Sequence, residues 1–131
     1  MTGEPVRRGG VVVRVEGQLR FLAATQAIRV TPAPRITPVP GAPQELVGIA
    51  VHEGVVLPVV AVGPARGEMV VCQHAGELLG IVGGHVEQTG SFDVVGEHPE
   101  LVHVGGEVAR PLDVAGLYAR VQAGARPGRW G

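Results

Sequence analysis

The sequence predicts a mainly β protein with one short helix near the C-terminal end. Hydrophobic residues make up 45% of the 131-residue chain and aromatic residues only 3%, so small aliphatic side chains must build the core. The 21 glycines and 11 prolines divide the chain into short segments, several of which are apolar runs joined by polar turns. This combination is typical of many short strands, in one domain or in two small subdomains with a common core.

The first predicted hairpin joins strands at 11–15 and 19–22 through a turn at 16–18. Residues 1–10 precede it and are expected to form a flexible N-terminus. These residues carry charge but no apolar stretch of the kind that a secretory signal needs.

The middle of the chain holds the most informative segment, a second predicted hairpin over 48–62 that turns at Gly54. A proline-rich lead at 31–43 comes before it and is expected to be extended, because proline excludes helix there. Between the first hairpin and this lead, Thr25 is expected to cap a short helical turn over 26–29.

A third predicted hairpin joins 69–73 and 78–82 through a turn at 75–77 and resembles the first in its spacing. The segment 101–114 in turn resembles the region around Gly54. One interpretation is an internal duplication, with each half contributing two hairpins. The alternative is that any two valine-rich hairpins look alike.

The chain is expected to end in a short helix that Asp113 caps, with apolar side chains at helical spacing: Leu117, Tyr118 and Val121. A single domain is therefore predicted over 11–121. The remainder, 122–131, is rich in glycine, proline and arginine and includes Trp130, and it is expected to be a disordered tail.

Alternation along the strands places Leu22, Val56, Val59 and Ile81 in the predicted core. Cys72 lies in the middle of a predicted strand and is interpreted as a buried small hydrophobe rather than a reactive thiolate.

Charge and cysteine content exclude several classes of protein. The net charge is −1, and the basic residues form no stripe, so nucleic acid is not an expected partner. One cysteine cannot form a disulfide within the chain, which is typical of the cytoplasm. The longest apolar region, 46–62, is interrupted by polar residues and proline and is too short to insert into a membrane.

No catalytic or metal-binding pattern is present in the sequence. The five histidines lack the repeated spacing of a zinc site, and Ser91 lies outside a Gly-x-Ser-x-Gly elbow. The glycine pairs do not form a phosphate-binding loop, and Gly83-Gly84 instead indicates a bulge or a barrel corner. We therefore expect no enzyme activity, no metal and no cofactor.

The order of the segments resembles the CheW family of chemotaxis coupling proteins over nearly all of 11–121. The stretch 36–43 is similar to the family's Ile/Val-Thr-x-Ile/Val-x-x-x-Pro segment. The family's following glycine, turn and apolar-Pro-apolar-apolar strand are matched by Gly48, Gly54, Pro58, Val59, Val60 and Val62. The resemblance implies two five-stranded, SH3-like β-barrel subdomains around a shared core. The residues alone leave open a single barrel or sandwich of six to eight strands.

Four positions depart from the family pattern. The family's turn Asn falls on Val51, its turn Arg on Glu53, its strand Asp on Ala61, and an Asp of its second half on Gly84. The exchange of arginine for glutamate changes the charge of a turn that the resemblance places near the partner-binding surface. The resemblance implies these partner-binding residues: Ile28, Val30, Ile36, Val51, Glu53, Gly54 and Val56.

The resemblance implies a non-catalytic adaptor that couples the cytoplasmic tip of a methyl-accepting chemoreceptor to the regulatory domain of a CheA-type histidine kinase. Such a protein is expected in the cytoplasm, at membrane-associated or nucleoid-associated chemosensory clusters. One alternative is a diverged regulator that binds only one of these partners. Another is an unrelated small β-barrel that binds a ligand.

Overall fold

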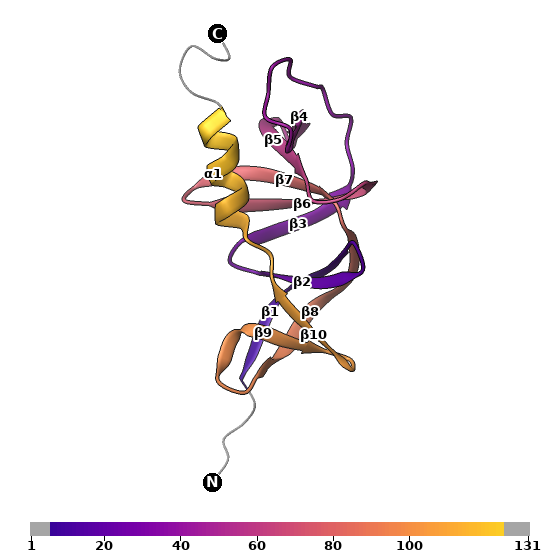
Figure 1. The fold of residues 1–131 in the computed structure, drawn as a ribbon, viewed down its shortest axis with the longest axis vertical. Coiled ribbons are helices and arrows are strands. Elements are labelled where there is room, and N and C mark those ends of the chain that lie inside the picture. Colours follow the sequence, from indigo (N-terminus) through magenta and orange to yellow (C-terminus); the bar gives the residue numbers. More distant parts are fainter. Residues whose placement is uncertain (1–5, 125–131) are drawn as a thin grey trace.

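The computed structural model describes residues 6–124 and contains ten strands and one helix within them (Figure 1). The elements, in chain order, are β1 (Arg7–Val15), β2 (Gln18–Ala23), β3 (Ala27–Pro32), β4 (Leu46–His52), β5 (Val55–Ala61), β6 (Ala65–His74), β7 (Glu77–Gly83), β8 (His85–Val95), β9 (His98–Val104), β10 (Glu107–Pro111) and α1 (Val114–Gly124).

The strands form two units of five, which confirms the predicted mainly β fold. One unit is a closed barrel with the order β1-β2-β10-β9-β8, and the other is a sheet with the order β3-β6-β7-β5-β4. The barrel and the sheet lie at opposite ends of an elongated molecule, with α1 along one side of the sheet (Figure 1). Within the described part of the chain, the second unit is an open sheet with β3 and β4 at its edges.

The two units have the same internal plan. Each contains two antiparallel hairpins, and the hairpins meet in a parallel pair, β2 with β10 in the barrel and β5 with β7 in the sheet. The fifth strand of each unit follows the other unit's hairpin in sequence: β8 comes after β7 but pairs with β1 and β9, and β3 comes after β2 but pairs with β6. This exchange links the two units, and the internal duplication stays a prediction.

Three hairpins turn through two residues that both have positive φ. The pairs are Glu16-Gly17, Glu53-Gly54 and Ala75-Gly76, with φ near 50° at the first residue and near 80° at the second. These values are those of a type I′ turn, whose twist matches that of the flanking strands and whose second position favours glycine.

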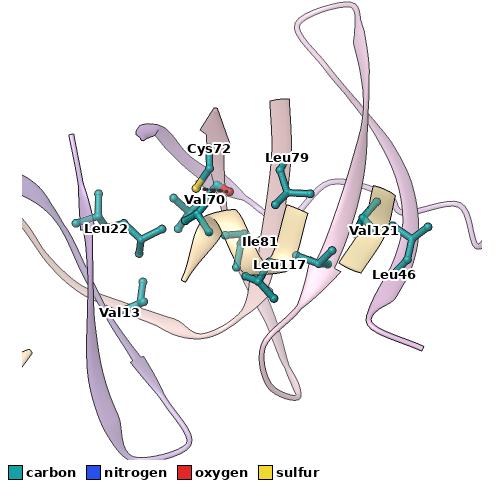
Figure 2. Close-up of a cluster of buried hydrophobic side chains, with 12 residues drawn as sticks. Val13, Leu22, Leu46, Val70, Cys72, Leu79, Ile81, Leu117 and Val121 are labelled. Carbon is teal, nitrogen blue, oxygen red and sulfur yellow. Dashed lines mark hydrogen bonds between the residues drawn. The ribbon is translucent and has the colours of Figure 1, made fainter. Parts of the chain in front are cut away.

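Side chains from both units and from α1 form the shared core (Figure 2). Leu22 comes from the barrel, Ile81 from the sheet and Leu117 from the helix. A second cluster fills the barrel and a third lies within the curved sheet. The prediction of buried Leu22, Val59 and Ile81 is confirmed, but that of Val56 is wrong because this side chain is 61% exposed.

The strand pairing explains the error at Val56. Leu57 and Val59 point inward into the sheet's own cluster, so Val56 must point outward. The next outward position after Pro58 is Val60, which is buried because α1 and the barrel cover that part of the strand. The outer face of β5 is therefore exposed at Val56 and covered at Val60.

Local boundaries differ from the prediction at three places. β1 begins at Arg7, because residues 7–10 pair with β8, so these residues are not part of a flexible N-terminus. Residues 27–32 form a strand against β6 rather than a helical turn. The helix continues through Gly124, past the predicted end of the domain, and Trp130 lies outside the described residues.

Candidate functional site

The outer face of the β4–β5 hairpin carries a group of exposed apolar side chains, which we call the hairpin patch: Ile49, Val51, Val55 and Val56. Ala50 and Leu57 point into the sheet's core, so alternation turns their neighbours toward solvent. Val51 and Val56 are register partners across the two strands and are each 61% exposed. Paired aliphatic side chains left in water on one face are typical of a surface that binds another protein.

The proline-rich lead forms one wall of a groove beside the hairpin patch. Thr37 and Ile49 exchange two backbone hydrogen bonds of 2.8 Å, which hold the lead against the edge of β4. This approach needs Gly48, since a Cβ there would overlap the carbonyl of Thr37. The resulting groove has a volume of about 290 Å³, and its walls are Pro34, Arg35 and Thr37 on one side and residues of the hairpin on the other.

An ion pair joins the hairpin turn to the opposite edge of the sheet. Nη1 of Arg29 on β3 lies 3.1 Å from Oε1 of Glu53, and the other carboxylate oxygen lies 3.2 Å from Nε2 of His52. Because β3 and β4 are the two edges in the pairing order, this contact requires the sheet to curl until its edges approach. Both members of the Arg29–Glu53 pair are more than half exposed.

The sequence-predicted binding residues fall into two groups. Ile28, Val51, Glu53, Gly54 and Val56 are exposed, and all of them except Ile28 belong to the β4–β5 hairpin. Val30 is half-buried against the shared core, and Ile36 is half-buried against the core of the sheet.

Sequence reasoning missed Ile49, Val55 and the groove wall at Pro34 and Arg35. Alternation from Val51 would have found Ile49, because both lie on one face of β4. No local signal could have found the groove, which depends on the contact between Thr37 and Ile49.

The described residues contain no cluster with the composition of a metal centre. No three His, Cys, Asp or Glu side chains gather among residues 6–124 in a way that could hold a metal ion. Burial raises the pKa of the Cys72 thiol to about 12, so this group is neutral and inert at ordinary pH, as predicted. Within the same residues, no helix is long and apolar enough to cross a membrane.

One charged network is built into the barrel. The Arg14 guanidinium on β1 donates to the carboxylates of Glu87 on β8 and Glu107 on β10, at 3.0 Å in each case. The hydrogen bond from Arg14 lowers the pKa of Glu87, and the two carboxylates raise the pKa of Arg14. Since the network joins three strands, it is a structural feature of the barrel.

Comparison with known proteins identifies the fold. No protein-family model matches the chain, and no curated protein matches it. Among solved structures, the scaffolding protein TtCheW from Thermoanaerobacter tengcongensis is similar, with a TM-score of 0.62 and 17% sequence identity. The alignment covers 77% of this chain and 70% of that one. The chain therefore has the fold of a CheW scaffolding protein, with two linked five-stranded units and a C-terminal helix.

Proposed function

We propose that this chain is a non-catalytic adaptor of a bacterial chemosensory system, in which it couples chemoreceptor cytoplasmic tips to the regulatory domain of a CheA-type kinase. The observation that carries the proposal is the hairpin patch with its groove, on a fold similar to that of a CheW scaffold. The adaptor would act in the cytoplasm, at chemosensory clusters.

The hairpin patch supports a binding role on energetic grounds. Covering a half-exposed valine or isoleucine side chain contributes roughly 1 kcal/mol, so the patch can supply several kcal/mol before the cost of association. The adjoining groove offers a concave surface for one apolar side chain of a partner. In this proposal Ile28, Val51, Gly54 and Val56 contact the partner, whereas the half-buried Val30 and Ile36 support the surface.

A narrower partner set is the second candidate function, and the Arg29–Glu53 pair favours it. Where the CheW pattern has a cation in the turn, this chain has a carboxylate that is already matched by an arginine of its own. A partner surface that complements a turn cation would meet the opposite charge here. The chain would then bind only one of the two partners, or a partner with a changed charge.

Binding measurements with separate partners test both candidates. A receptor cytoplasmic fragment and a kinase regulatory domain from the same organism would each be titrated with the chain by calorimetry. Val51→Asp and Val56→Asp place a charge in the hairpin patch, and Val6→Asp makes the same change at an exposed valine of the barrel end.

We expect the two patch variants to lose at least tenfold in affinity for a partner that the wild-type chain binds, and the Val6 variant to bind as wild type. Binding of both partners supports the coupling role, and binding of one supports the narrower role. Binding of neither, or an equal loss with Val6→Asp, would contradict the proposal.

A further inference from the structure

A second groove lies on the outside of the barrel, where β2 meets β10 and away from the hairpin patch. Its volume is about 470 Å³, and its walls include Gln18, Arg20, Glu107, Val108 and Arg110. This size is in the range of sites that enclose a small organic ligand or a short peptide segment, and it exceeds what one water or a simple ion would fill.

Two arginines lie side by side in this groove. Arg20 and Arg110 are register partners in the parallel β2–β10 pair, and both point away from the barrel interior that Leu19, Phe21 and Ala109 fill. Among residues 6–124, no carboxylate forms an ion pair with either guanidinium. In the described part of the chain, the Arg20 side chain donates only to the side-chain oxygen of Gln18, at 2.8 Å.

The acidic side chain in the groove offsets only part of the charge of this pair. Glu107 is bound by Arg14, whose Nη2 lies 3.0 Å from one of its oxygens, and Arg14 also binds Glu87. One guanidinium and two carboxylates leave one negative charge against the two positive charges of Arg20 and Arg110. Two like charges on neighbouring strands repel each other, which disfavours this arrangement in the isolated chain. A ligand carboxylate between them would remove the repulsion and accept hydrogen bonds from two planar guanidinium groups.

Val108 gives the groove an apolar wall. This side chain is 45% exposed and belongs to the same strand as Arg110, two residues earlier, so both face outward. We propose that the groove binds an acidic segment of a partner protein, with a carboxylate held between Arg20 and Arg110 and a neighbouring apolar side chain against Val108. This site is separate from the hairpin patch and does not depend on its function.

A fluorescently labelled peptide that alternates glutamate and leucine is a suitable probe, and anisotropy of the intact chain with this peptide measures the affinity. The R20Q/R110Q variant removes both groove cations. The matched control R66Q/R120Q removes two exposed arginines elsewhere, so both variants have the same net charge. Thermal melts establish that each variant is folded.

We expect R20Q/R110Q to weaken peptide binding by about tenfold or more and the control to change it by less than about twofold. Val108→Asp adds a competing carboxylate without touching the arginines and should weaken binding similarly. Equal losses in the control and the groove variant, or wild-type binding by V108D, would overturn the proposal. Displacement of the peptide by inorganic phosphate as effectively as by unlabelled peptide would also overturn it, in favour of a site for small anions.

Discussion

Gly10 leaves room inside the barrel for the ring of Phe21. A Cβ at this position would overlap the carbonyl oxygen of Leu22 on the neighbouring strand and would lie 2.7 Å from the ring of Phe21. Neither group can move easily, because the first is backbone and the second is a buried ring in edge contact with Phe92, at 6.0 Å between centroids. Gly10→Ala should therefore destabilise the protein by about 1–3 kcal/mol through overpacking.

Gly9 provides the matched control, one residue earlier on the same strand. A Cβ there would make ordinary contacts of 3.7 Å with Gly90 and 3.8 Å with Ala24, and neither glycine has a left-handed φ. Gly9→Ala should thus leave the free energy of unfolding within about 0.5 kcal/mol, or raise it slightly by restricting the unfolded chain. Urea unfolding followed by circular dichroism measures the free energy of unfolding of the two variants. Equal unfolding midpoints for Gly10→Ala and Gly9→Ala would refute the steric explanation for Gly10.

Four further predictions follow from burial and charge. Val59→Ala should lower the free energy of unfolding by about 1–3 kcal/mol because the side chain is fully buried, whereas Val56→Ala should change it little. Equal melting midpoints for the two variants would show that the register of β5 is wrong. The Cys72 thiol should react with a thiol reagent only in denaturant, and labelling of the native protein would contradict its burial. Because its pKa is lowered by folding, Glu87 stabilises the fold above about pH 4.5, the ordinary carboxyl pKa, and this contribution is lost as the pH falls through the lowered value. An E87Q variant should thus lose less stability on acidification than wild type, as acid titrations can measure. Glu53→Gln should lower stability by less than about 1 kcal/mol, since the pair is exposed, so a large change in partner affinity for that variant would report an interface.

The hairpins and the helix could be predicted because their signals are local. A two-residue turn such as Glu53-Gly54 can be predicted from its glycine and from the apolar residues on either side. The start of the helix can be predicted from Asp113, whose side chain accepts a hydrogen bond from the backbone of Gly116. The strand at 27–32 could not be predicted in this way. Its pattern after Thr25 is compatible with a helical turn, and only pairing with β6, far along the chain, selects the strand.

In the candidate sites, too, contacts between neighbouring residues could be predicted and contacts between distant segments could not. Val51, Glu53 and Gly54 lie at the same end of one hairpin, so their proximity follows from the sequence alone. The groove beside them exists because Thr37 pairs with Ile49, and the arginine pair exists because β10 returns to lie parallel to β2. Contacts of this kind depend on the closure of long loops, for which the sequence carries no short-range signal.

The charge at the hairpin turn is best understood together with its partner on β3. Taken alone, Glu53 is a reversal of the arginine that the CheW pattern predicts, and it would suggest a lost contact. In the structure, the carboxylate meets Arg29 across the edges of the sheet at 3.1 Å. An exposed pair of this kind adds little stability, and its result is a neutralised turn beside an apolar surface. In the proposed function, such a turn would reduce long-range electrostatic attraction and leave recognition to the hairpin patch and its groove, where shape and apolar contact would decide which partner fits.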